Sequence, residues 1–338
     1  MKKVVITGER RAELVEVPDP QPKNDWALVK VWATPMCTEY KTFVAGHPAQ
    51  HLGHEAAGEV VAMAQPGRVR VGDRVVVQPA HGCGKCSLCL AGDYIYCEDR
   101  SDFQELFGTL EGSATYCQYL LKPDWLLSPI PPDVSYERAS LALCGLGPSF
   151  GAFQAMNVNA FDTLLITGLG PVGLGAVINA RFRGARVLAV ESVPWRVERA
   201  RQMGVAAVLD PRSPDVLEQL RELTDGRGVD CALDCSGTVA AERLCIDATR
   251  RRGRVAFVGE CSGDLPVRAS PDMIRKGLAV FGSWHYNLKD YPRVTRVIQE
   301  SPLIDLLTSH VLPMSRVQEA FEICASHACG KVILKPWE

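Results

Sequence analysis

The chain has 338 residues, of which 47% are hydrophobic and 22% are charged, and its formal net charge is −2. This composition predicts an ordinary globular protein long enough for two domains, and it argues against a disordered chain. The charge balance gives no basic face for nucleic acid and no polybasic run for an anionic membrane, so we expect small-molecule partners.

The N-terminal segment has only the short apolar run Val4–Ile6 before polar residues follow, which is too short for the core of a secretory signal. No stretch approaches the roughly eighteen apolar residues that a membrane-spanning helix needs. We therefore expect a cytoplasmic protein. The thirteen cysteines are an odd number and fall below the density of a disulfide scaffold, so clustered cysteines are interpreted as metal ligands.

The two halves of the chain carry different patterns. Up to about residue 145, short apolar runs are broken by Gly and Pro, which predicts an all-β unit. These runs are KKVVI, WALVKVWA, GEVVAMA, GDRVVV and TYCQYLL. From Thr163 onward, strand-like runs alternate with helical segments such as PVGLGAVINARFRG and PDVLEQLRELT, which predicts βαβ units and a parallel sheet.

The C-terminal part of the sequence predicts two helices and a final strand. DYPRVTRVIQES and MSRVQEAFEICASH have helical patterns, and GKVILKP has the pattern of a closing strand. No internal repeat or low-complexity linker interrupts the chain. The expected fold class is therefore α/β, with a β-rich first part and a doubly wound parallel sheet in the second.

Four cysteines fall within a short segment of the β-rich part with the spacing C-x2-C-x2-C-x7-C: Cys83, Cys86, Cys89 and Cys97. Four thiolates so close in sequence can surround Zn²⁺ tetrahedrally, and such a site leaves no position for substrate, so we predict a structural zinc. An iron–sulfur cluster is the main alternative, but the fourth cysteine of bacterial ferredoxins usually precedes Pro, whereas Cys97 precedes Glu98. A disulfide or the absence of metal also stays open.

The strand TLLIT runs directly into the turn Gly168-Leu-Gly170-Pro171-Val172-Gly173, which precedes an apolar helix. The first Gly allows a tight turn, the second lets the backbone approach a pyrophosphate, and the third allows close packing of helix on strand. The helix N-terminus offers free N–H groups to the phosphates. This arrangement predicts a dinucleotide-binding site.

Glu191 ends the next predicted strand, where an acid can bond the ribose hydroxyls of NAD and repel the 2′-phosphate of NADP. Arg196 follows five residues later and can stack on adenine or attract a phosphate. We therefore expect NAD rather than NADP. The alternative is a glycine-rich turn beside an incidental surface acid.

If the four-cysteine site is closed, a catalytic metal needs other ligands. Cys37, His54 with Glu55, and Cys144 are the candidates. Two thiolates and one imidazole leave a fourth position open, as a catalytic zinc site requires. Because these residues come from separate segments, their spacing does not show that they meet, and each alone has the simpler interpretation of a buried structural residue.

The motifs GHEAAGEVV, VGDRVVV, the cysteine lobe, GLGPVG, GRVAFVG and GKVILKP occur in one order along nearly the whole chain. In this order they resemble the zinc-dependent medium-chain alcohol and polyol dehydrogenases. The resemblance implies a GroES-like β catalytic domain over 1–147 with the zinc lobe at 81–98, and a Rossmann NAD-binding domain over 148–285. It also implies that 286–338 returns to the catalytic domain.

The resemblance also implies roles for the scattered residues. Cys37 and His54 match the first two catalytic zinc ligands, and Glu55 matches an acid that lies behind the zinc and can bind it transiently. Cys144, followed by Gly145, resembles the third ligand of alcohol dehydrogenases, although polyol dehydrogenases often have Glu in this region. Whether Cys144 or Glu55 completes the site stays open, and the expected metal content is two Zn²⁺ per chain.

One departure from the family lies beside the first ligand. The family commonly has Cys-x-Ser/Thr-Asp, whereas this chain has Cys37-Thr38-Glu39. A one-residue deletion would let Thr38 and Glu39 replace the Ser-Asp pair. Alternatively, Glu39 faces the substrate as a base or hydroxyl acceptor, or it only supports the zinc from behind.

We therefore expect an enzyme that transfers a hydride between a secondary alcohol and NAD, with a polyol, sugar alcohol or cyclitol as substrate. Zinc would lower the pKa of the alcohol, and the proton would leave by Thr38 or Glu39. The alternatives are a ketone or aldehyde reductase using NAD(P)H and a non-enzymatic zinc-module scaffold. The resemblance suggests a homodimer or homotetramer.

Overall fold

The computed structural model describes residues 1–338, and the chain divides into two compact units. The first unit contains residues 1–144, 287–299 and 308–338, and the second contains residues 145–286 and 300–307. The chain thus leaves the first unit directly after Cys144 and returns to it in two segments near the C-terminus.

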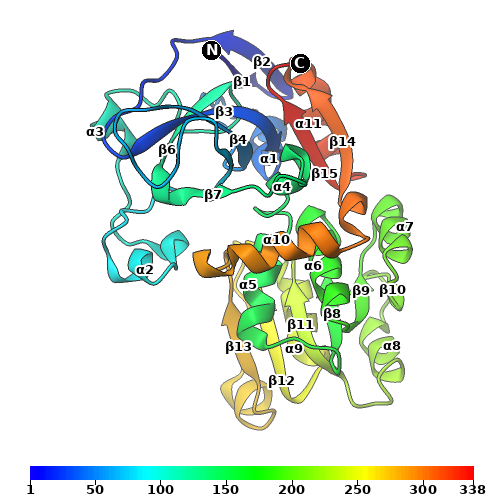
Figure 1. Cartoon of the computed structure of the whole chain (residues 1–338). Helices are drawn as coiled ribbons and strands as arrows, with labels where there is room; N and C mark the ends of the chain where they lie inside the picture. The colour runs from blue at the N-terminus through cyan, green and yellow to red at the C-terminus, as the bar shows by residue number, and fades with distance from the viewer. The chain divides into compact units, whose positions relative to one another are not determined.

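The first unit is built on a mixed sheet of seven strands, in the order β14-β15-β3-β4-β5-β7 with β6 also paired to β3 (Figure 1). A separate antiparallel hairpin, β1-β2, completes its strands. The strands are β1 (Lys2–Gly8), β2 (Arg11–Glu16), β3 (Trp26–Pro35), β4 (Ala56–Met63), β5 (Arg74–Val77), β6 (Tyr119–Pro123), β7 (Leu127–Pro129), β14 (Thr308–Pro313) and β15 (Lys331–Lys335).

Short helices connect these strands: α1 (Glu39–Ala45), α2 (Ser87–Leu90), α3 (Phe103–Phe107) and α4 (Tyr136–Ser140). Two longer C-terminal helices are α10 (Tyr291–Glu300) and α11 (Val317–Ala325). The predicted C-terminal helices and closing strand are confirmed, whereas α1, β2, β7 and β14 were not expected. Helix α1 has only seven residues and ends at Gly46 in a left-handed conformation, so its apolar pattern is too short to be recognised.

The pairing of β3 with β4 determines where two of the candidate site residues lie. These strands run antiparallel, with Ala33 opposite Ala57, so the end of β3 lies beside the start of β4. Cys37 follows the end of β3 and His54 precedes the start of β4. The register therefore brings two segments that are distant in sequence to the same end of this strand pair.

The C-terminal strand β15 lies next to the same end of β3. It pairs antiparallel with β3, and Ile333 lies opposite Pro35. The amide of Met36 donates to the carbonyl of Val332 at 2.8 Å. The last strand of the chain therefore lies next to the segment that carries Cys37.

The second unit contains an all-parallel sheet in the order β10-β9-β8-β11-β12-β13 (Figure 1). The strands are β8 (Thr163–Thr167), β9 (Arg186–Val190), β10 (Ala207–Leu209), β11 (Val229–Asp234), β12 (Thr249–Phe257) and β13 (Ala279–Gly282). Its helices are α5 (Gly147–Met156), α6 (Pro171–Phe182), α7 (Pro194–Gln202), α8 (Val216–Glu222) and α9 (Val239–Ala248). The predicted alternation of strands and helices, and the α/β fold class, are confirmed.

The central strands of this sheet are apolar because helices cover them. Every residue of β11 is buried, and β8 is buried except at its first residue. The order of the strands reverses direction at β8, where the chain passes first to β9 and later to β11. In a doubly wound sheet such a switch point opens a crevice at the carboxyl ends of the strands. No helix of the structure has both the length and the apolar character needed to cross a membrane.

Candidate metal and nucleotide sites

The four clustered cysteines lie in a lobe of the first unit that has little regular structure. Only the four-residue helix α2 and one 3-10 turn fall between Cys83 and Cys97. All four sulfur atoms lie within 4.8 Å of one another. Backbone amides point at the sulfurs: the amide of Cys83 lies 3.3 Å from the sulfur of Cys97, and that of Cys86 lies 3.3 Å from the sulfur of Cys83.

The distances between the sulfurs fit a tetrahedral zinc site. Sulfur ligands about 2.3 Å from a common Zn²⁺ lie about 3.8 Å apart along each edge of the tetrahedron. The sulfurs of Cys86 and Cys97 are 3.8 Å apart, and those of Cys83 and Cys89 are 4.0 Å apart. These separations are about twice a disulfide bond length, and all four cysteines are free. The donor set therefore fits Zn²⁺ and not a disulfide.

The scattered candidates meet in the first unit. Ligand atoms of Cys37, His54, Glu55 and Cys144 all lie within 4.8 Å of one another. The Nε2 atom of His54 lies 3.2 Å from the sulfur of Cys144. About a third of the His54 side chain is exposed, so this second cluster reaches solvent on one side. Two thiols and one imidazole suit Zn²⁺, and three such ligands leave the fourth tetrahedral position for water or substrate.

Glu55 and Cys144 are joined directly. The backbone amide of Cys144 donates to Oε2 of Glu55 at 3.0 Å. The other oxygen of Glu55 accepts from Nζ of Lys331 at 2.5 Å, and both of these side chains are fully buried. Lys331 also donates to the carbonyl of Met36. Each carboxylate oxygen of Glu55 thus has its own donor, and Oε1 lies 4.0 Å from His54 Nε2.

Glu39 supports His54 from the opposite side of the imidazole. Its Oε1 lies 2.8 Å from Nδ1 of His54, and its Oε2 accepts from the amide of Cys37 at 3.1 Å and from the hydroxyl of Tyr116 at 2.9 Å. Neither oxygen is left without a partner. A carboxylate on Nδ1 orients the ring so that Nε2 faces Cys144.

The ionisable groups of this cluster shift one another's pKa values. Burial opposes ionisation of Glu39, but the hydrogen bond and positive charge of His54 lower its pKa to about 2. Burial raises the pKa of Glu55 to about 7, against the opposing charge of Lys331. The hydrogen bond from Cys144 holds the pKa of the Cys37 thiol well below its usual range, despite burial. The site therefore favours a thiolate at Cys37, which is the form that binds metal.

Thr38 lies beside this cluster but outside its hydrogen-bond network. It is exposed and precedes helix α1, and its side chain makes no capping hydrogen bond to that helix. A hydroxyl in this position can exchange a proton with solvent. Thr38 therefore differs from Glu39, whose carboxylate is enclosed.

The glycine-rich turn of the second unit has the geometry that its sequence predicts. Gly168 has a φ of +80°, and a β-carbon there would lie 2.8 Å from that of Ser236. A β-carbon at Gly173 would lie 1.9 Å from the carbonyl oxygen of Gly168, so helix α6 packs closely on β8. At Gly170 such an atom would meet nothing closer than the guanidinium of Arg196 at 3.7 Å. The middle glycine therefore leaves open space above the backbone, as a bound pyrophosphate requires.

Glu191 lies beside this turn at the carboxyl end of β9. Its Oε2 accepts from the amide of Leu169 at 2.8 Å, and its Oε1 accepts from the amides of Ser192 and Val193 at 2.7 and 2.9 Å. The guanidinium of Arg196 is 3.7 Å away, and its buried Nε has no partner. Pro171 and Val172 begin helix α6 directly beyond the turn. A carboxylate fixed in this way retains lone pairs for the hydroxyls of a ribose.

Two residues of the second cluster were not identified from the sequence. Lys331 lies in an otherwise apolar closing strand, and a lysine at 0% exposure requires a buried acid as a partner. A lysine within such an apolar strand is the sequence signal that could have drawn attention to it. Tyr116 gave no such signal, because tyrosine is common in strand-like segments.

Comparison with known proteins supplies a family for this arrangement. The family model for the alcohol dehydrogenase GroES-like domain matches residues 23–132, and the one for zinc-binding dehydrogenases matches residues 171–300. The chain is 31% identical to the uncharacterized zinc-type alcohol dehydrogenase-like protein YphC of Escherichia coli, over 97% of each chain. It is 30% identical to sorbitol dehydrogenase of Bacillus subtilis over 99% of this chain and 97% of that protein.

Other similar proteins include a threonine dehydrogenase and an alcohol dehydrogenase of known structure. L-threonine 3-dehydrogenase of Pyrococcus horikoshii is 32% identical over 95% of this chain and 94% of that protein. Among solved structures, alcohol dehydrogenase TADH from Thermus sp. ATN1 superposes with a TM-score of 0.88 at 26% identity, over 99% of each chain. A GroES-like domain together with a Rossmann domain, as predicted, is thereby confirmed.

Proposed function

Because the chain belongs to the zinc-type medium-chain alcohol dehydrogenases, we propose that it oxidises a secondary alcohol to a ketone and reduces NAD. In this reaction the alcohol carbon gives a hydride to the nicotinamide, and the hydroxyl gives a proton to solvent. The observation that carries the proposal is the convergence of Cys37, His54, Glu55 and Cys144 within 4.8 Å. Such a donor set with an exposed side is typical of a catalytic zinc site and not of a structural one.

Each cluster has a separate role in this proposal. Cys83, Cys86, Cys89 and Cys97 hold a structural Zn²⁺, while Cys37, His54 and Cys144 hold a catalytic one. Glu55 is assigned a position behind the metal, because both of its oxygens already accept hydrogen bonds from Lys331 and Cys144. Each oxygen of Glu55 keeps a second lone pair, so Glu55 remains available as an alternate ligand.

The chain's own groups prepare the site for this chemistry. Zinc, when bound, lowers the pKa of the alcohol hydroxyl as a Lewis acid. Glu39 holds Nδ1 of His54 and so keeps Nε2 directed toward Cys144. Thr38 is exposed beside Cys37, so we assign its hydroxyl the transfer of the substrate proton to solvent. Glu39 is assigned no proton transfer, because its carboxylate is mostly buried and is held by His54, Cys37 and Tyr116.

The substrate class follows from the relatives by analogy. Sorbitol and L-threonine, which name two of the relatives, both carry a secondary hydroxyl flanked by polar groups. We therefore propose a polyhydroxylated secondary alcohol, such as a sugar alcohol or cyclitol, as the substrate. An amino alcohol is the nearest alternative, and L-threonine represents it in the test.

The experiment is a screen of NAD reduction by the zinc-loaded protein, followed at 340 nm. The panel contains polyols, cyclitols, L-threonine, simple secondary alcohols and, for the reverse reaction, ketones with NADH or NADPH. Polyols or cyclitols should give the highest kcat/KM. Turnover of L-threonine alone would overturn the substrate class, and the absence of turnover across the panel would overturn the proposed reaction.

The proposed cofactor is NAD, because the charge of Glu191 lies beside the pyrophosphate turn where it would oppose a 2′-phosphate. Like charges brought together at a binding site cost several kcal/mol, so we expect kcat/KM for NAD to exceed that for NADP by about 100-fold or more. Glu191→Gln retains the shape of the side chain and should reduce this ratio at least tenfold. The measurement is kcat/KM for both cofactors at fixed, saturating alcohol.

A suitable control is Glu198→Gln, which removes an exposed acid from helix α7 without contact to the turn. This variant should keep the NAD preference of the unchanged protein. An unchanged protein that uses NADP as well as NAD would contradict the assignment of Glu191.

We also propose that the protein is a homo-oligomer with a dimer as its basic unit. Strand β13 lies at an edge of the parallel sheet, and its Val280 is exposed together with the nearby Ile274. An apolar edge with unpaired backbone groups is a natural surface for pairing with a second copy of the chain. The mass in solution from light scattering should be a multiple of two chains.

A further inference from the structure

The hydroxyl of Tyr116 connects two parts of the proposed catalytic metal site. It donates to Oε2 of Glu39 at 2.9 Å and lies 3.3 Å from the backbone amide of Cys37. The same amide also lies 3.1 Å from Oε2 of Glu39. The hydroxyl, the carboxylate oxygen and the amide therefore form one closed group next to Cys37.

The other oxygen of this carboxylate holds the imidazole of His54. Because the two oxygens of Glu39 are rigidly joined, fixing Oε2 also fixes the direction of Oε1. Oε1 lies 2.8 Å from Nδ1 of His54, on the side of the ring away from Cys144. We propose that Tyr116 is a positioning residue for the catalytic zinc site, whose hydroxyl locks Glu39 so that Glu39 holds His54 in the metal-binding orientation.

The support from Tyr116 matters because the acid at position 39 is a glutamate. A glutamate side chain has one more rotatable bond than an aspartate, so holding it in a single geometry costs more conformational entropy. Glu39 is also the first residue of the short helix α1, and its carboxylate is held by His54, Cys37 and Tyr116, which all lie outside that helix. The extra hydrogen bond from Tyr116 offsets the greater freedom of this longer side chain.

Tyr116 is itself held in place from several sides. Its amide donates to the carbonyl of Leu52 at 2.9 Å, and its carbonyl accepts from the amide of Val4 at 2.8 Å. A β-carbon at Gly53, which directly precedes His54, would lie 2.3 Å from the Tyr116 ring. The ring therefore packs against the backbone that carries His54, and only 1% of Tyr116 is exposed.

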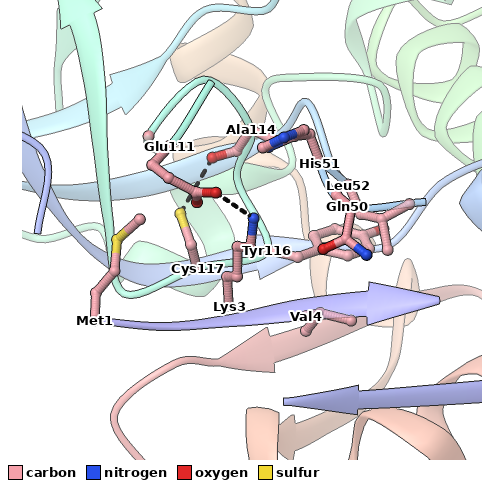
Figure 2. A pocket seen from close by; sticks show the side chains of 11 residues that line it. Met1, Lys3, Val4, Gln50, His51, Leu52, Glu111, Ala114, Tyr116 and Cys117 are labelled. Carbon is pink, nitrogen blue, oxygen red and sulfur yellow. Dashed lines mark hydrogen bonds and ion pairs between the residues drawn. The ribbon is translucent and has the colours of Figure 1, made fainter. Parts of the chain in front are cut away.

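The space around this tyrosine leaves it little freedom. Tyr116 lines a small cavity together with Leu52, Gln50 and the ion pair between Lys3 and Glu111 (Figure 2). This cavity has a volume of about 10 Å³, which is close to the minimum for a single water molecule. The ring is buried against Gly53 and its hydroxyl is bonded to Glu39, so this orientation is held on both sides.

The variant Tyr116→Phe tests the proposal, which rests on the proposed function, because it removes the hydroxyl and keeps the ring. Supporting groups behind a metal ligand typically contribute 10–100-fold to metal affinity, so we expect zinc to leave the catalytic site about tenfold more readily. The measurement is zinc release to a chromogenic chelator, in which two sites of different affinity are resolved as two phases. The absorption spectrum of the cobalt-substituted protein should shift as well, because the imidazole is less well oriented.

Tyr291→Phe is the matched control. Tyr291 is also buried, and its hydroxyl donates to the carbonyl of Pro129 at 2.8 Å, which belongs to neither metal cluster. Tyr291→Phe should lower the melting temperature about as much as Tyr116→Phe does, because each variant loses one buried hydrogen bond. It should leave both phases of zinc release unchanged. A control that weakens zinc binding equally would show a general loss of stability and overturn the positioning role.

A double-mutant cycle shows whether the hydroxyl acts through Glu39. In a Glu39→Ala background, Tyr116→Phe should cause no further loss of zinc affinity. Equal zinc release and an equal cobalt spectrum in Tyr116→Phe and the unchanged protein would overturn the inference alone. If the unchanged protein binds only one zinc, held by the cysteine lobe, the proposed function itself fails.

Discussion

Replacing Cys144 by Ser is expected to reduce the zinc content from about two ions to about one per chain and to abolish most of the turnover. Cys144 provides one of two sulfurs in the cluster, and a serine hydroxyl is a much poorer zinc ligand than a thiolate. A Lewis-acidic metal contributes several kcal/mol to transition-state stabilisation, so kcat should fall about 1,000-fold or more. Metal analysis and steady-state kinetics check both parts of this prediction.

The melting temperature should change little in this variant. The backbone amide of Cys144, which donates to Glu55, is not altered by the substitution. Cys245→Ser is the control, since Cys245 is buried in the second unit beside Thr167 and lies outside both cysteine clusters. The control should keep two zinc ions and full turnover. A Cys144→Ser protein with two zinc ions and normal kcat would exclude Cys144 as a ligand.

Replacing Cys97 by Ser is expected to affect stability rather than turnover. Zinc content again falls to about one, but the main consequence is a loss of stability. The lobe has only one turn of α-helix, and its small core consists of Cys89, Tyr94, Ile95 and Cys97 together with Leu126 from outside the lobe. So small a core cannot maintain the lobe without its metal. Loss of a structural metal belongs to the most destabilising class of substitutions, so we expect the melting temperature to fall by about 10 °C or more.

The two cysteine variants distinguish the clusters even though each leaves one zinc ion. Well below its melting temperature, Cys97→Ser should retain most of its turnover, whereas Cys144→Ser should not. Calorimetry and kinetics on the same preparations provide the comparison. If Cys97→Ser lost turnover at a temperature where it stays folded, the lobe would have to contribute to the reaction and the assignment of a structural site would be wrong.

The local motifs were predictable from the sequence because their geometry is decided by neighbouring residues. The turn from Gly168 to Gly173 needs glycine at three positions for steric reasons, and the structure shows a close contact at the first and third and open space at the second. The cysteine lobe is also local, since its four sulfurs are drawn from one short segment. In both cases the spacing along the chain is enough to determine the arrangement.

The scattered cluster was only partly predictable. Cys37, His54 and Cys144 could be proposed from the family resemblance, but their meeting depends on the pairing of β3 with β4 and on the hydrogen bond between the Cys144 amide and Glu55. The roles of Thr38 and Glu39 could not be separated from sequence. They differ in their partners: Glu39 is enclosed by three groups, and Thr38 is exposed.

By itself, the sequence determined the family, the two kinds of domain and the residue types available to bind zinc and a dinucleotide. Only the tertiary structure decided which groups surround the metal-binding residues. Tyr116 is 77 residues from Glu39 along the chain, and Lys331 is 276 residues from Glu55. Hydrogen bonds over such separations depend on strand register and packing, which no local pattern of residues encodes.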